Sequence, residues 1–242
     1  MITFEDLKKA ELGHTFSYRE LRNQCSAVWG GVAWPGKRPG FAVVVGMDHK
    51  LHLNNRDVFL LEEFESFDIR KLVRQCGALD LKYHISIHRS YNLDSPDRWI
   101  GDYKHDAASR FIQELNDELQ QGHGRNDSTP GRRFSLDSTS MIEMEKGLYS
   151  YILPQIKELM HPERRRLFLK DSKLANYLGE IEESEIAELE RGSYPAIEAL
   201  AFAVIEMRES DRRSRAYADS AYEDEDENPN NYASRGENPI NY

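Results

Sequence analysis

The sequence predicts an α/β fold in which a central sheet carries helices on its faces. Residues 41–47 (Phe-Ala-Val-Val-Val-Gly-Met) form a continuous apolar run rich in β-branched side chains, which is typical of a strand buried on both faces. Apolar residues then recur at helical spacing over residues 69–76. Further helical stripes occupy the last third of the chain. Strands followed by alternating helices indicate a sheet covered by helices.

The first third of the chain contains the central predicted strands. Residues 16–28 could form a short helix, and the glycines and prolines of residues 30–40 then indicate a loop. After the run at 41–47, a turn over residues 54–55 leads to a second strand over residues 57–65. We expect these two strands to pair.

Helical and alternating patterns follow in the middle of the chain. The helix predicted over residues 69–77 ends at Gly77, a residue favoured just after a helix. Residues 81–88 alternate between apolar and polar side chains, as in a half-buried strand. A short strand over residues 98–102 precedes a helix whose inward residues are Ala107, Ala108, Phe111, Ile112, Leu115 and Leu119.

The remaining elements are mostly helical. Residues 122–131 are predicted to form a loop, and residues 132–136 a further strand. Helices are then predicted over residues 145–160, 171–190 and 195–208. The last of these begins with a proline, which is favoured in the first turn of a helix.

Composition excludes several classes of protein. The 242 residues suffice for one or two domains. With 32 Lys and Arg against 42 Asp and Glu, the net charge of -10 argues against a generally basic nucleic-acid wrapper. Two cysteines are too few for a disulfide framework or a cysteine-built zinc site. No apolar run is long enough to span a bilayer, and the start lacks the pattern of a secretion signal. We therefore expect a soluble cytoplasmic protein without membrane partners.

The end of the chain has its own composition. Residues 223–242 contain six acidic residues and one basic residue, and they are poor in aliphatic side chains. The hexapeptide at 227–232 (Glu-Asn-Pro-Asn-Asn-Tyr) nearly repeats at 237–242. The segment is either a solvated low-complexity tail or a docking peptide used twice. We expect a lead-in over residues 1–40, a folded domain over 41–217 and a disordered acidic tail over 218–242.

Two aspartates follow predicted strands. Asp48 closes the run at 41–47, and Asp102 closes the short strand before the next helix. Ligand sites of open α/β sheets form at the carboxyl ends of strands. Two carboxylates held together there would need a cation between them, and oxygen ligands suit Mg²⁺ or Mn²⁺. The other interpretation, that each aspartate simply forms a turn, remains open.

Several short segments point to a known family. They are Val43-Val44-Val45-Gly46-Met47-Asp48, Trp99-Ile100-Gly101-Asp102, residues 147–157, residues 174–178 and residues 194–203. In this order the chain resembles the nuclease domain of the large terminase subunits that package viral DNA, over roughly residues 40–208. The resemblance implies a ribonuclease-H-like fold, with a mixed central sheet flanked by helices on both faces. It also implies a metal-dependent DNA endonuclease.

The resemblance also implies a third acid. The Asp-Asp pair that usually supplies it in the family is replaced here by Tyr194-Pro195, and Glu198 aligns with a later acid of the same motif. Asp48, Asp102 and Glu198 are therefore the implied catalytic residues and ligands of two Mg²⁺ or Mn²⁺ ions. On helical spacing alone, Glu198 could equally be a solvated surface residue.

The implied reaction is phosphodiester hydrolysis. One ion would activate water, and the other would stabilise the leaving oxygen. Lys50, Lys104, Arg132 and Arg133 would contact the phosphate backbone, giving weak DNA binding without sequence preference. A packaging ATPase or a portal ring is the implied partner, in the host cytoplasm if the protein is viral.

A second function remains open. The missing Asp-Asp pair would also fit a nuclease-fold remnant with impaired catalysis. Such a protein would act as an adaptor or assembly component of the packaging machinery, and the acidic repeat tail would be its docking element.

Overall fold

The computed structural model describes the parts of the chain that build one compact unit, Met1–Met207. The described residues are Ile2, 4–9, 25–48, 57–83, Ile85, 98–121, 133–160, 167–169 and 172–205. The acidic repeat tail and its predicted boundary at residue 217 lie outside these residues, as do the predicted turn at 54–55 and the predicted loop at 122–131.

A five-stranded mixed sheet forms the centre of this unit, in the order β4-β1-β2-β3-β5. Its strands are β1 (Cys25–Ala33), β2 (Gly40–Asp48), β3 (Val58–Ser66), β4 (Arg98–Gly101) and β5 (Leu167–Phe168). The first three pair antiparallel in sequence order, whereas β4 is parallel to β1 and β5 is parallel to β3. The predicted α/β class is confirmed.

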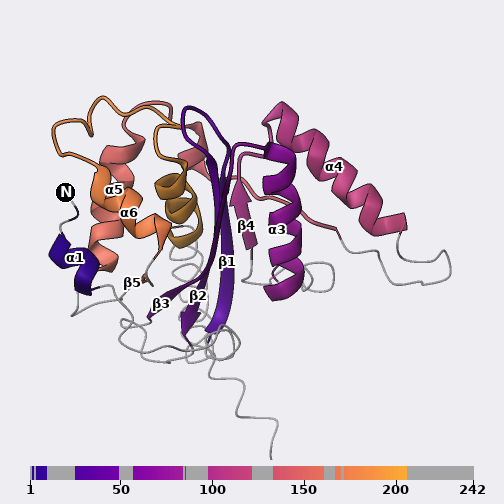
Figure 1. The fold of residues 1–242 in the computed structure, drawn as a ribbon, viewed down its shortest axis with the longest axis horizontal. Helices are drawn as coiled ribbons and strands as arrows, with labels where there is room; N and C mark the ends of the chain where they lie inside the picture. Colours follow the sequence, from indigo (N-terminus) through magenta and orange to yellow (C-terminus); the bar gives the residue numbers. More distant parts are fainter. Residues whose placement is uncertain are drawn as a thin grey trace, which may run out of the picture. The chain divides into compact units, whose positions relative to one another are not determined.

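Helices cover both faces of the sheet (Figure 1). One face carries α3 (Ile69–Tyr83) and α4 (Asp106–Gln121), and the other carries α5 (Leu148–Leu159), α6 (Lys173–Glu180) and the helix of residues 195–205. Shorter helical segments are α1 (Phe4–Lys9) and the 3-10 turn η2 (Ser140–Glu143). Among the described residues, no helix is both long enough and apolar enough to cross a bilayer.

Strand β2 explains why the core has two halves. Alternate residues of a strand point to opposite faces, so Val43 and Val45 join the core beneath α5 and α6, while Ala42 and Val44 join the core beneath α3. All nine residues of β2 are buried. The prediction of a strand buried on both faces is confirmed.

The largest correction concerns β1 (Cys25–Ala33), because the sequence predicts a helix over residues 16–28 and a loop over residues 30–40 in its place. Gly30 and Gly31 are strand residues at close-packed positions and do not mark a turn. A Cβ atom at Gly30 would lie 2.3 Å from the Trp99 ring, and one at Gly31 would lie 1.9 Å from the Ala199 carbonyl oxygen. Gly30 leaves room for the Trp99 ring of the neighbouring strand β4 on one face of the sheet, and Gly31 lets the helix of residues 195–205 approach β1 on the other face.

Three smaller predictions also change. Residues 81–83 belong to α3, because Leu79 and Tyr83 continue its buried face; the rest of the predicted strand, apart from Ile85, lies outside the described residues. Within the predicted strand at 132–136, the described residues 133–136 form no regular strand, and a single parallel bridge joins Ile100 and Asp137. The helix predicted over residues 171–190 ends at Glu180, and turns follow.

Candidate functional site

Asp48 and Asp102 lie at opposite ends of the sheet. Asp48 is the last residue of β2 and pairs with Cys25, the first residue of β1. Asp102 follows Gly101, which pairs with Val32 near the other end of β1. The seven residue steps along β1 from Cys25 to Val32 correspond to about 23 Å at the usual rise of a strand. The expectation that Asp48 and Asp102 form one metal site is wrong, because β2 runs antiparallel to both β1 and β4.

Asp48 has a structural environment of its own. The residue is 5% exposed, its backbone N–H donates to the Asp57 carbonyl at 3.0 Å, and its own carbonyl accepts from the Ser26 hydroxyl at 3.0 Å. These bonds tie the end of β2 to the entry of β3 and to the start of β1.

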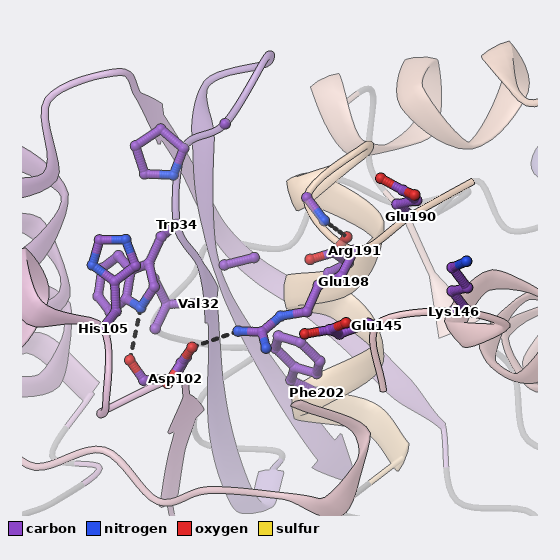
Figure 2. A pocket seen from close by; sticks show the side chains of 14 residues that line it. Val32, Trp34, Asp102, His105, Glu145, Lys146, Glu190, Arg191, Glu198 and Phe202 are labelled. Atoms are coloured by element: carbon purple, nitrogen blue, oxygen red, sulfur yellow. Dashed lines mark hydrogen bonds and ion pairs between the residues drawn. The ribbon is translucent and has the colours of Figure 1, made fainter. Parts of the chain in front are cut away.

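The carboxyl ends of β1 and β4 border a cavity of about 440 Å³, here called the β1–β4 crevice (Figure 2). Parallel strands bring their ends to the same edge of a sheet, where ligand sites of open α/β sheets form. The crevice is lined by Val32, Ala33, Trp34, Pro35, Gly36, Asp102, His105, Glu145, Lys146, Glu190, Arg191, Gly192, Glu198 and Phe202. It contains two of the three predicted metal ligands, Asp102 and Glu198, but not Asp48.

Both carboxylate oxygens of Asp102 have partners. Oδ2 lies 2.5 Å from Arg191 Nη2, and Oδ1 accepts the backbone N–H of Lys104 at 3.0 Å. The Asp102 carbonyl accepts the Trp34 Nε1–H at 2.8 Å, which ties the residue after β1 to the residue after β4. The other guanidinium nitrogen, Arg191 Nη1, donates to the Ile142 carbonyl. The side chains of Arg191 and Asp102 are 29% and 19% exposed, so solvent only partly screens their pair.

Glu198 is a buried acceptor, and the interpretation as a solvated surface residue is wrong. It is 2% exposed in the first turns of the helix of residues 195–205. Its Oε1 accepts the Tyr149 hydroxyl at 2.5 Å and the Gly192 N–H at 2.6 Å. The Tyr149 oxygen in turn accepts the Tyr194 N–H at 2.6 Å. This network links α5 to the turn that carries Arg191.

The same network shifts two pKa values. Burial raises the pKa of Glu198, and the hydrogen bonds from Tyr149 and Gly192 and the positive charge of Arg191 offset only part of that rise. Burial, followed by the negative charge of Glu198, raises the pKa of Tyr149. Tyr149 therefore stays protonated and donates to the carboxyl group.

A Glu198→Gln variant is expected to flatten the pH dependence of stability. The folded protein binds more protons than the unfolded chain between the ordinary pKa of 4.5 and the raised pKa of Glu198. The stability that Glu198 contributes to the folded protein is therefore fully present below pH 4.5, and it is lost as the pH rises through the pKa of Glu198 in the folded state. Glutamine keeps an oxygen acceptor for Tyr149 and Gly192 but does not titrate. Urea unfolding from pH 4 to pH 8 checks this, and parallel profiles for the two proteins would contradict it.

The loop between β1 and β2 is fixed against the turn that carries Arg191. The Arg38 guanidinium lies 4.2 Å from the centre of the Tyr194 ring, and its Nη1 is 2.9 Å from Glu180 Oε2. A Cβ atom at Gly36 would be 3.3 Å from the Gly192 carbonyl oxygen. Arg38, Tyr194 and Glu180 do not line the crevice, so contacts outside it help to hold its two walls together.

The crevice does not fit the predicted two-metal centre. A pair of divalent ions needs several carboxylate oxygens that are free to bind metal. In the crevice, however, Arg191 binds Oδ2 of Asp102, and two protein donors bind Oε1 of Glu198. The end of β1 supplies Ala33 to the crevice and no carboxylate. In the described part of the chain, no three His, Cys, Asp or Glu side chains are grouped closely enough to hold a metal ion.

The predicted phosphate contacts are only partly described. Lys104 is exposed, and its Nζ lies 3.6 Å from Glu143 Oε1. Arg133 is exposed. Lys50 and Arg132 lie outside the described residues. A joint basic surface formed by these four residues remains a prediction.

Sequence reasoning missed Arg191, Tyr149 and Trp34. A single arginine in a turn between predicted helices carries no sequence signal of its own. Tyr149 falls in the helix predicted over residues 145–160 and in the segment of residues 147–157 that carries the resemblance, and Trp34 falls in the loop predicted over residues 30–40. Recognising β1 as a strand would have placed Trp34 at its carboxyl end, beside Asp102.

Comparison with known proteins gives no match: no family model, no curated protein and no solved structure is similar to this chain. The candidate site therefore depends on its own geometry.

Proposed function

We propose that this chain is a ribonuclease-H-like domain without metal-dependent nuclease activity, and that it serves as an adaptor or assembly component. One observation carries the proposal: Arg191 Nη2 lies 2.5 Å from Asp102 Oδ2 in the β1–β4 crevice. A cationic side chain of the protein itself thus binds the one carboxylate that stands at the end of a parallel strand in this site.

The sheet supports the ribonuclease-H-like part of the proposal. The resemblance implies a mixed sheet built in the order of a buried strand ending in an aspartate, two further strands, a helix, a strand ending in a second aspartate, and a further helix. The elements β1, β2, β3, α3, β4 and α4 follow each other in this order, and β4 pairs in parallel with β1. With this assignment the first strand is β1, which ends at Ala33. The strand that ends at Asp48 is the second.

The charges support the non-catalytic part. Two-metal hydrolysis depends on carboxylates that are ionised and free to bind metal. Arg191 neutralises Asp102, and burial raises the pKa of Glu198, which disfavours its ionised form. The net charge of -10 also weakens any attraction of the whole chain to phosphate. The acidic repeat tail remains the proposed docking element of the adaptor.

A plasmid-nicking assay tests the proposal. The full chain is incubated with supercoiled DNA and either Mg²⁺ or Mn²⁺. We expect no nicking above the buffer control, and the same result for Asp102→Asn. The matched control is Asp106→Asn, which removes an exposed carboxylate from the start of α4, outside the crevice.

Metal-dependent nicking that is lost in Asp102→Asn and kept in Asp106→Asn would overturn the proposal. That outcome would support the nuclease function that the resemblance implies.

A further inference from the structure

We propose that an apolar groove beside α5 is a docking site for an amphipathic helix of a partner protein, with lysines or arginines next to its apolar face. The groove, here called the α5 groove, shares no lining residue with the β1–β4 crevice. The inference rests on the adaptor role proposed above and deepens it, because it names a docking surface and the chemistry of the partner that fits it.

The first argument is the shape of the groove, which follows one side of a helix. Its volume is about 450 Å³, within the range of roughly 300–1,000 Å³ that is usual for ligand pockets. From α5 it is lined by Tyr149, Ser150, Leu153, Pro154 and Lys157. Residues at this spacing form one stripe along a helix, and this stripe is about 12 Å long at 1.5 Å per residue. A second helix laid along it would place its side chains between those of α5.

The second argument is the apolar surface that the groove still offers. Ile2 and Leu153 are 7% and 6% exposed, and they line the groove where it meets the core. Pro154 of α5 and Ala187, in the turns that follow α6, also line it, but both are exposed. A partner that covers these residues would remove apolar surface from water, which favours binding.

The third argument is a backbone acceptor beside this apolar surface. In a regular helix the Ser150 carbonyl would accept the N–H of residue 154, but Pro154 has no N–H to donate. Both residues line the groove. A lysine or arginine side chain of the partner carries N–H donors for this carbonyl.

The fourth argument is negative charge. Glu183 lines the groove. Three more exposed glutamates lie in the same segment after α6, namely Glu182, Glu185 and Glu188. Within the described residues, no ion pair involves any of these four side chains. Acids beside an apolar groove complement a helix that carries cations next to its apolar face.

The same charges argue against the acidic repeat tail as the occupant. Residues 223–242 contain six acidic residues and one basic residue, so the glutamates beside the groove would repel this segment. A separate, basic partner fits better.

Fluorescence anisotropy with the full chain and a labelled peptide tests the inference. The probe is an amphipathic helical peptide with leucines along one face and lysines on both sides of that face. A control peptide has glutamates in place of the lysines. We expect the chain to bind the probe, with an affinity that falls as salt rises, and not to bind the control peptide.

Two variants locate the binding. Ala187→Trp fills the groove from an exposed position, and Glu183→Lys reverses a charge that lines it. Each should weaken probe binding about tenfold or more. Their matched controls are Ala78→Trp on α3 and Asp117→Lys on α4, at exposed positions on the other face of the sheet. Both controls should bind the probe as the wild type does, and all four variants should keep the wild-type urea midpoint.

Three results would overturn the inference. The first is a wild type that does not bind the probe. The second is equal affinity of Glu183→Lys and Asp117→Lys, because the probe would then bind another acidic surface. The third is a wild type that sedimentation shows to be a dimer and that Ala187→Trp makes monomeric, because a second copy of the chain would then occupy the groove.

The nicking assay separates this inference from the proposed function. Metal-dependent cleavage by the wild type overturns the proposed function, whatever the peptide does. An inert wild type that does not bind the probe overturns only the inference about the α5 groove.

Discussion

A Gly31→Ala variant is expected to lose about 3 kcal/mol of unfolding free energy or more. The new Cβ would lie 1.9 Å from the Ala199 carbonyl oxygen and 3.1 Å from the Ala203 Cβ, both in the helix of residues 195–205. The first contact is with backbone, so no side-chain rotation relieves it. The helix would have to move away from β1, and the packing around Glu198 would move with it.

Urea unfolding measures this loss, with Gly179→Ala as the matched control. A Cβ at Gly179 in α6 would lie 3.5 Å from Leu7 Cδ1, an ordinary contact. Alanine there should be neutral or should stabilise the helix by about 0.5–1 kcal/mol. A Gly31→Ala variant as stable as the wild type would contradict the close approach of helix and strand.

A Tyr149→Phe variant is expected to lose about 2–3 kcal/mol of unfolding free energy. The hydroxyl donates to Glu198 Oε1 and accepts the Tyr194 N–H, and both partners are buried. Phenylalanine keeps the ring packing but leaves the N–H without its acceptor and the carboxyl group without one of its donors.

The matched control for this loss is Tyr151→Phe on the same helix. Tyr151 is 46% exposed, so its substitution should change stability by less than about 0.5 kcal/mol. Equal effects of the two substitutions on the urea midpoint would show that the buried network does not stabilise the fold as described.

The elements with a strong apolar pattern could be predicted from the sequence. The run at residues 41–47 became β2, and the helical spacing after Ile69 became α3. Strand β1 could not be predicted because it contains Gly30 and Gly31, and glycine usually weakens or interrupts a strand. The two glycines are needed because of tertiary contacts: the Trp99 ring packs against Gly30, and the helix of residues 195–205 packs against Gly31. A single sequence does not show such contacts.

The candidate site was predicted in part. Asp102 follows a strand and lies at the edge of the crevice, as the pattern indicated. Asp48 also follows a strand, but the sequence does not reveal strand direction, and β2 runs the opposite way. Glu198 shares the crevice with Asp102, and both carboxyl groups accept hydrogen bonds from the protein itself. Arg191 could not be predicted, because its role depends on a turn that brings it to a residue 89 positions earlier in the chain.

Anomalous diffraction from a wild-type crystal grown in Mn²⁺ would show directly whether a divalent ion binds in the β1–β4 crevice. We expect no manganese peak in the crevice, and we expect Arg191 bound to Asp102 as in Figure 2. A manganese ion coordinated by Asp102 and Glu198, with Arg191 displaced from the carboxylate, would contradict it.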